Sequence, residues 1–145
     1  MTRTVRTLEA YMELDADAAR LAKGTNLATV VTLMPDGQPQ AQLTWVDHDG
    51  EHILVNTEPV RQRSRNLRRD PRVTVLIHSG EDAYDWAEIR GHVVETIGGD
   101  RARAHIDELS RRYMDADYGR PIGPDGRIIL VIEPDKVNTP HNMGR

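Results

Sequence analysis

Residues 26–57, NLATVVTLMPDGQPQAQLTWVDHDGEHILVNT, have the pattern of a β-meander. They contain three β-rich runs, at 27–33, 39–47 and 52–57, and an Asp-Gly pair stands in each gap between runs. Asp-Gly between two such runs is a strong hairpin signal, because the turn requires residues that tolerate a positive φ angle. We therefore expect three consecutive antiparallel strands joined by tight turns.

The second of these runs alternates between apolar and polar side chains, which is the period of a strand with two unlike faces. Its apolar positions are Ala41, Leu43 and Trp45, and its polar positions are Gln40, Gln42 and Thr44. We expect the apolar face to point into the core and the polar face to point to solvent.

The rest of the chain supplies helices and further strands around the meander. Helical spacing of apolar residues predicts two helices, at 8–22 and within 98–119, and strand patterns occupy 73–78, 86–94 and 128–137. Gly24 is placed to end the first helix and Asp100 to cap the second. The pattern predicts a mainly β protein with flanking helices, a small antiparallel barrel of about six strands and two to four helices. Residues 1–145 are expected to form one domain.

An arginine cluster follows the meander in residues 58–77, EPVRQRSRNLRRDPRVTVLI, with six arginines between Arg61 and Arg72. Asp70 precedes Pro71 and is therefore disfavoured in a helix, so a helix here must end near Arg69. Ser64 is a good N-cap for such a helix, which would leave Arg61 and Arg63 in the loop ahead of it. A helix N-terminus, a hydroxyl and two guanidinium groups together form a phosphate site.

Two other readings of this cluster remain open, a solvated charged face and a nucleic-acid interface. Arg65, Arg68 and Arg69 would in any case lie further along the helix, in solvent. A nucleic-acid interface is disfavoured because the chain has a formal charge of −4 and no aromatic residue lies between Arg61 and Arg72.

The composition excludes several classes of protein and of functional site. The chain has no cysteine, which excludes disulfides and thiolate chemistry. No apolar run approaches the ~20 residues that cross a bilayer, and the N-terminus has no signal-peptide pattern, so we expect a cytoplasmic protein without membrane contact. No metal site is predicted: a turn separates His48 from His52, although His78 and His92 could meet across the sheet.

The order of these motifs resembles the pyridoxamine 5'-phosphate oxidase-like split β-barrel family, over roughly residues 8–140. The PDGQPQ hairpin, HILVNT and above all RSRNLRRDPR carry the resemblance, and the branch that uses the deazaflavin coenzyme F420 is the most similar. The resemblance implies an FMN-binding-like fold in which Arg61, Arg63 and Ser64 hold the cofactor phosphate. Arg63 is a departure, because members of that branch often have lysine there.

The resemblance also implies further site residues. Asn66 matches the phosphate motif, Asn56 and Thr57 would run along the cofactor ring, and Tyr84 or Trp86 would supply an aromatic side chain. Ordinary packing is an alternative role for the two aromatic residues. The C-terminal TPHNMGR resembles tails that reach the cofactor pocket of a partner chain.

The function implied is that of a homodimeric F420-dependent reductase with cofactor sites at the subunit interface. Hydride would move between the deazaflavin and a planar organic substrate. Extra cations near the site would suit the polyglutamate tail of F420, and the candidates are Arg68, Arg120, Arg127 and Lys136. An FMN-dependent oxidase or reductase is the alternative, and a non-catalytic cofactor or haem carrier is a third reading. No catalytic residue is evident. Tyr84, His78 and water are equal candidates for a proton donor.

Overall fold

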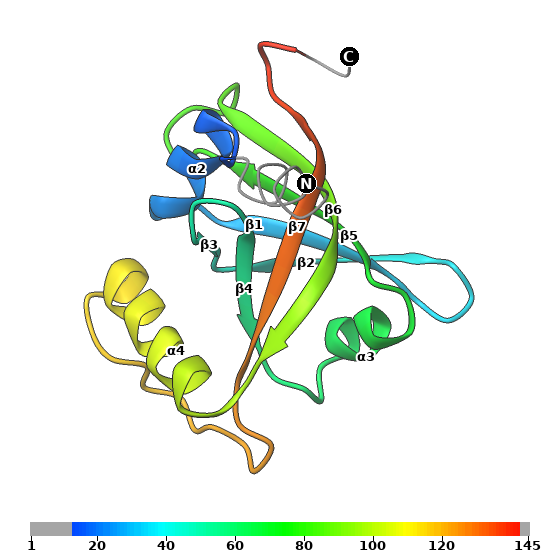
Figure 1. Ribbon diagram of the computed structural model, residues 1–145. Helices are drawn as coiled ribbons and strands as arrows, with labels where there is room; N and C mark the ends of the chain where they lie inside the picture. Colours follow the sequence, from blue (N-terminus) through cyan, green and yellow to red (C-terminus); the bar gives the residue numbers. More distant parts are fainter. Residues whose placement is uncertain (1–12, 143–145) are drawn as a thin grey trace, which may run out of the picture.

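The computed structural model describes residues 13–142, which form three helices and seven strands (Figure 1). The helices are α2 (Ala16–Lys23), α3 (Gln62–Arg69) and α4 (Gly99–Met114). The strands are β1 (Ala28–Leu33), β2 (Pro39–Thr44), β3 (Asp47–His48), β4 (Ile53–Thr57), β5 (Arg72–His78), β6 (Trp86–Ile97) and β7 (Ile128–Asn138).

All seven strands belong to one antiparallel sheet in the order β2-β1-β5-β6-β7-β4-β3. The sheet curls into a half-barrel, with α2 near one end and α3 and α4 near the other (Figure 1). Two register shifts interrupt the β6–β7 pairing, and such bulges bend and twist a sheet. Gly91 lies at one of them, where a Cβ atom would stand 2.2 Å from the carbonyl oxygen of Glu133. The predicted mainly β fold with flanking helices is confirmed. The predicted meander of three consecutive strands is wrong: the 39–47 run divides into β2 and β3, which lie at opposite edges of the sheet, so β2 pairs with β1 while β4 pairs with β3 and β7.

The main core lies inside the curl of the sheet, where alternate residues of each strand are buried. Strand β5 shows this period plainly, because every second residue from Val73 is buried. Helix α2 covers the core with one apolar face. The core includes Ala18, Leu21, Ala22, Val30, Val55, Val75, Ile77, Ile89 and Ile132. A second cluster of Leu54, Ala102, Ile129 and Val131 packs α4 against β4 and β7, so that both faces of β4 are buried.

The helix boundaries follow local signals in part. Helix α2 ends at Gly24 as predicted, and Asp15 caps its start by accepting hydrogen bonds from two backbone N–H groups. The earlier part of the predicted 8–22 helix lies largely outside the described residues. The prediction that Asp100 caps α4 is wrong, because Gly99 has a φ of 65° and the helix already begins there.

The alternation predicted in β2 is present, but its two faces are reversed. Leu43 is 60% exposed and Ala41 is exposed, whereas Gln40 and Gln42 are partly buried. The reason is tertiary: β2 is an edge strand, and its inner face meets polar groups of α3. Asn66 Nδ2 donates to Gln40 Oε1 (3.3 Å), so the polar residues are the ones that find partners inside.

Trp45 lies beyond the end of β2 and packs against α4. Its ring stacks on that of Tyr113, with centroids 5.2 Å apart and planes 7° apart. No helix within residues 13–142 is both long enough and apolar enough to cross a membrane.

Candidate functional site

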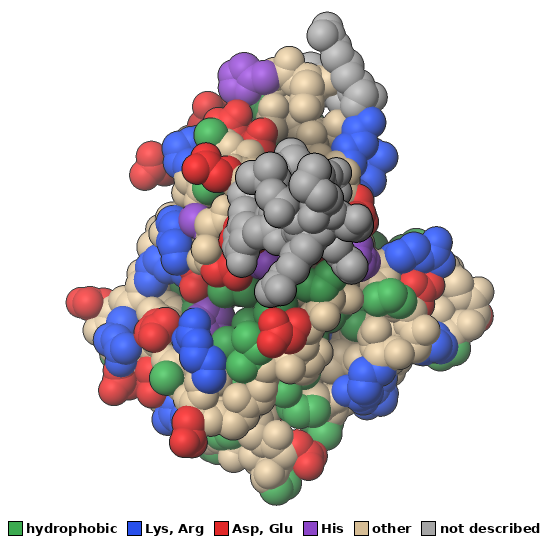
Figure 2. All heavy atoms as spheres, viewed as in Figure 1, with side chains coloured by type: hydrophobic (Ala, Val, Ile, Leu, Met, Phe, Trp, Pro, Cys, Tyr) green, Lys and Arg blue, Asp and Glu red, His purple; other side chains and the backbone are tan. Residues whose placement is uncertain are grey.

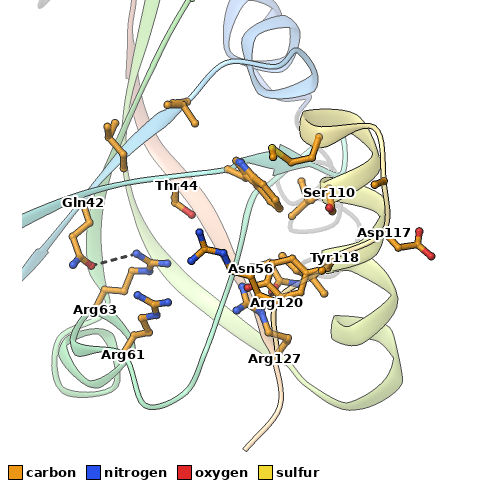
Figure 3. Close-up of a pocket in the computed structure, with 18 residues that line it drawn as sticks. Gln42, Thr44, Asn56, Arg61, Arg63, Ser110, Asp117, Tyr118, Arg120 and Arg127 are labelled. Atoms are coloured by element: carbon orange, nitrogen blue, oxygen red, sulfur yellow. Dashed lines mark hydrogen bonds between the residues drawn. The ribbon is translucent and has the colours of Figure 1, made fainter. Parts of the chain in front are cut away.

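A cavity of about 690 Å³ opens between α3 and α4, over strands β2 and β4 (Figure 3). One part of its lining is cationic and another part is apolar and aromatic. The cationic part consists of Arg61, Arg63, Arg120 and Arg127, and the apolar part includes Leu27, Leu43, Trp45, Leu109, Met114 and Tyr118.

Helix α3 presents the first two arginines to this cavity. It begins at Gln62, and Arg61 is its N-cap residue, so the predicted N-cap role of Ser64 is wrong. A turn after β4, closed by the Arg61 N–H on the Glu58 carbonyl (3.2 Å), starts the helix earlier than the serine suggested. The Ser64 hydroxyl instead donates to that same carbonyl (2.7 Å). The predicted end of the helix at Arg69 is confirmed.

Arg63 lies within the helix and not ahead of it, and as a residue it is only 8% exposed. Its Nε donates to Thr57 Oγ1 (3.1 Å) and its Nη1 to Gln42 Oε1 (3.2 Å). Burial, together with the positive charges of Arg61 and Arg127, lowers the pKa of Arg63 to about 10. Within residues 13–142 no carboxylate forms an ion pair with it.

Arg127 approaches the same region from the residue before β7. It is 9% exposed, its Nε donates to Asn56 Oδ1 (2.8 Å), and burial lowers its pKa. The Arg127 guanidinium also stands over the ring of Tyr118, 5.3 Å from the centroid. Glu58 Oε1 accepts from Arg127 Nη1 (3.4 Å) and from Arg61 Nη2 (3.3 Å).

The charges at this end of the cavity do not balance. Arg61, whose side chain is half-exposed, and Arg127 share the carboxylate of Glu58, and Arg63 has no carboxylate partner among the described residues. The three guanidinium groups and one carboxylate leave a formal charge of +2. Buried charge without a partner is unfavourable, so binding an anion here would be favoured. A phosphate dianion matches both the charge and the donor geometry of guanidinium groups.

The aromatic wall suits a flat ligand. Trp45 is stacked on Tyr113, and the edge of Tyr118 meets Trp45 at a centroid distance of 6.3 Å and an angle of 85°. Tyr118 therefore lies between the apolar wall and Arg127. A ring and an anion on one molecule would each find a complementary surface in the cavity.

The structure brings together only some of the residues predicted for a site. Asn56, Arg61 and Arg63 line the cavity. Thr57, Ser64 and Asn66 lie behind it as buried support: Thr57 holds Arg63, Ser64 holds the β4–α3 turn, and Asn66 holds Thr32 and Gln40. Tyr84 is 84% exposed on the β5–β6 loop and does not line the cavity of its own chain.

Of the four cations predicted for a cofactor tail, two line the cavity and two do not. Arg120 and Arg127 line the cavity, whereas Arg68 donates to the carbonyl of Pro59 and Lys136 lies elsewhere, on β7. Figure 2 shows blue side chains over α3, where Arg65, Arg68 and Arg69 are exposed as predicted.

Sequence reasoning missed Gln42, Trp45 and Tyr118 as lining residues, and it missed the closeness of Arg127 to Arg61. Gln42 could have been found from its alternation on β2, had the strand been recognised as an edge. The other contacts join residues far apart in the chain, for which the sequence offers no local signal.

His78 and His92, which the strand pattern allowed to meet across the sheet, do not meet. In the β5–β6 register His78 pairs with Trp86 and His92 with Arg72, at opposite ends of the ladder. His92 instead lies at the surface between Glu133 and Asp135, with nitrogen–oxygen distances of 3.3 and 2.9 Å.

The predicted C-terminal tail at 139–145 extends beyond the described residues. Its first part turns back on itself at the end of β7, where Asn142 N donates to the Thr139 carbonyl (3.1 Å).

Comparison with known proteins agrees with the fold. Residues 14–140 match the family described as pyridoxamine 5'-phosphate oxidase. A solved F420 reductase is 28% identical, with 82% of this chain and 94% of that chain covered and a TM-score of 0.72. Protein Rv2991 from Mycobacterium tuberculosis is 26% identical, with 88% and 84% covered and a TM-score of 0.67. HupZ from Group A Streptococcus, at 15% identity with 86% and 92% covered and a TM-score of 0.60, shares the fold. With most of its length matched, this chain belongs to the pyridoxamine 5'-phosphate oxidase family.

Proposed function

We propose that the protein is an F420-dependent oxidoreductase that binds the deazaflavin cofactor in the cavity between α3 and α4. Arg61, Arg63 and Arg127 would hold its phosphate, and the wall of Trp45 and Tyr118 would face its ring or the substrate. When bound, the cofactor supplies hydride transfer to or from a planar organic substrate. The chain's own contribution is to bind, to orient and to exclude water.

One observation carries this proposal: three guanidinium groups converge on one cavity end with a single carboxylate among them. A solvated charged face would be exposed, but Arg63 and Arg127 are nine-tenths buried. A nucleic-acid interface would also need an open surface for several phosphates, whereas two of the three guanidinium groups, those of Arg63 and Arg127, are buried. A small ligand with one compact anionic group fits better.

Two observations favour F420 over FMN as that ligand. The F420 reductase is similar over 94% of its own length. Arg120 gives the cavity a fourth guanidinium group, beyond the three that suit a phosphate, and F420 carries further carboxylates in its tail. FMN, with one phosphate and no such tail, remains the second candidate.

The sheet offers support for a homodimer with cofactor sites at the subunit interface. Leu43 and Ala41 are exposed on β2, beside Thr29 and Val31 of β1, which are their register partners and point to the same side. Leu43 also lines the cavity. A second copy that covers this face would bury the exposed apolar residues and close the cavity from one side.

A fluorescence titration of the purified protein with F420, and separately with FMN, tests the proposal. We expect saturable binding of F420, weakened at least tenfold by Arg63→Ala. Arg101→Ala, which removes a guanidinium group from an exposed position on α4, is the matched control and should bind as the wild type does. Preference for FMN would instead support the FMN-dependent alternative. Binding of neither, or equal loss in both variants, would refute the phosphate site.

A further inference from the structure

We infer that a buried chain of hydrogen bonds from Asp47 through His105 and Asn56 positions Arg127, and thereby controls how tightly the cavity holds an anion. His105 and Asp47 line no part of the cavity and would act only through Arg127. The inference rests on the proposed function, because the anion is the phosphate of the cofactor proposed above.

This chain of hydrogen bonds joins four separate parts of the fold. Asp47 lies on β3, His105 on α4, Asn56 on β4, and Arg127 directly before β7. All four are buried, with exposed fractions of 7%, 0%, 3% and 9%. His105 Nε2 lies 2.9 Å from Asp47 Oδ2, His105 Nδ1 lies 3.1 Å from Asn56 Nδ2, and Arg127 Nε donates to Asn56 Oδ1 over 2.8 Å.

Chemistry fixes the direction of every bond in this chain. A guanidinium group only donates, so Asn56 must turn its oxygen to Arg127. The carbonyl of Ala102 only accepts, so the Asn56 Nδ2 group that lies 3.0 Å away must donate to it. The second hydrogen of Nδ2 then points to His105 Nδ1, which must accept. His105 is thereby held as the neutral tautomer with hydrogen on Nε2, and it donates to Asp47.

The far end of the chain is anchored by charge. Asp47 accepts from Lys23 Nζ (2.7 Å) and pairs with Arg112 Nη2 (3.0 Å). Burial opposes the ionisation of Asp47, but hydrogen bonds from His105 and Lys23 outweigh it and hold its pKa well below the usual range. A carboxylate that stays ionised keeps His105 in its donor orientation.

Arg127 has little else to hold it. Its only other polar contact among the described residues is Nη1 to Glu58 at 3.4 Å, and it rests on the Tyr118 ring. If Asn56 turned its amide, a donor would face Nε, and the guanidinium would leave the position in which it meets Arg61 and Arg63. His105 and the carbonyl of Ala102 together oppose that turn, because both accept from Nδ2, and His105 is the one of the two that a substitution can remove. His105 and Asp47 are therefore positioning residues for the anion end of the cavity.

Two variants at one position separate positioning from packing. His105→Gln keeps an acceptor for Asn56 and a donor for Asp47, whereas His105→Leu fills the space and removes both. We expect His105→Leu to weaken the binding of F420 about tenfold, as loss of a charge-assisted contact would, with His105→Gln within about twofold of the wild type. All titrations are made at a temperature where circular dichroism shows each variant folded.

A double-mutant cycle of His105 and Arg127 distinguishes a positioning role of His105 from a purely structural one. Arg127→Ala should weaken binding by a similar factor, and His105→Leu combined with Arg127→Ala should bind as Arg127→Ala alone does. Wild-type affinity in His105→Leu, or losses that multiply in the double variant, would overturn the inference.

A measurement without cofactor keeps the two proposals distinguishable. In the ¹⁵N NMR spectrum, the hydrogen-bonded Nε–H of Arg127 should give a slowly exchanging signal, assigned by its loss in Arg127→Ala. This signal should persist in His105→Gln and vanish in His105→Leu. If it persists in His105→Leu, the positioning role is refuted. If the wild type binds neither F420 nor FMN while the signal behaves as expected, the proposed function fails and the positioning of Arg127 stands.

Discussion

Replacing Arg63 with methionine should make the ligand-free protein more stable and its cofactor binding weaker. Methionine keeps the apolar stem that packs in the helix and removes the charge. Burial, with the nearby charges of Arg61 and Arg127, lowers the pKa of Arg63 to about 10 in the folded chain, which corresponds to about 3 kcal/mol of unfavourable free energy for the charged form at neutral pH. The sign follows from the direction of the shift: a cation with a lowered folded-state pKa destabilises the fold at every pH below that value.

The gain in stability is reduced because two hydrogen-bond acceptors lose their donor. Thr57 Oγ1 and Gln42 Oε1 each lose a donor, at a cost of about 1 kcal/mol apiece. The net expectation is about 1 kcal/mol of added stability, or an increase of about 4 °C in the melting temperature of a chain of this size.

Differential scanning fluorimetry, with and without F420, measures both effects. Arg63→Met should melt higher than the wild type without ligand, and F420 should raise its melting temperature much less. The control Arg101→Ala removes an exposed charge and should change stability by less than about 0.5 kcal/mol. A lower melting temperature for ligand-free Arg63→Met would refute the view that the cavity holds unbalanced positive charge.

Three further predictions concern other parts of the molecule. Asp47 has a lowered folded-state pKa, so its stabilising effect should be complete above about pH 4, the ordinary aspartate value, and should be lost as the pH falls below it. Urea titrations should therefore show that the wild type loses stability more steeply in acid than Asp47→Asn does, and parallel curves would contradict this. Leu43→Asp should convert the proposed homodimer to a monomer in analytical ultracentrifugation and weaken F420 binding, and an unchanged sedimentation coefficient would exclude β2 from the interface. Gly91→Ala should lower the free energy of unfolding by about 2 kcal/mol, because its Cβ would stand 2.2 Å from the Glu133 carbonyl oxygen, while Gly80→Ala, with no atom within 4 Å, should have little effect.

Short-range signals account for most of what could be predicted. The Asp-Gly pairs placed the turns of two hairpins, β1–β2 and β3–β4, although not the single meander that was predicted. Gly24 ended α2, and Asp70 before Pro71 ended α3. Each of these depends on the backbone preferences of one or two residues, which hold wherever the segment lies. The clustering of arginines in residues 61–72 likewise identified the segment from which Arg61 and Arg63 enter the cavity.

Errors arose where a local rule had to decide a long-range question. The alternation in β2 is a property of the sequence, but which face points inward depends on what packs there, and the polar groups of α3 reversed the expectation at Leu43. Ser64 has the chemistry of an N-cap, yet the turn closed at Glu58 started α3 earlier and gave its hydroxyl another partner.

The sequence by itself determined most of the strands, the hairpin turns and the basic segment, because these follow from preferences within a few residues. Only the tertiary structure decided the site. Arg127 and Asn56 are 71 residues apart and His105 and Asp47 are 58 apart, so their hydrogen bonds exist only once the sheet has curled and α4 has packed on β4. The charge balance of the cavity is decided in the same way, because burial and the approach of distant guanidinium groups set it, and neither is a property of any one segment.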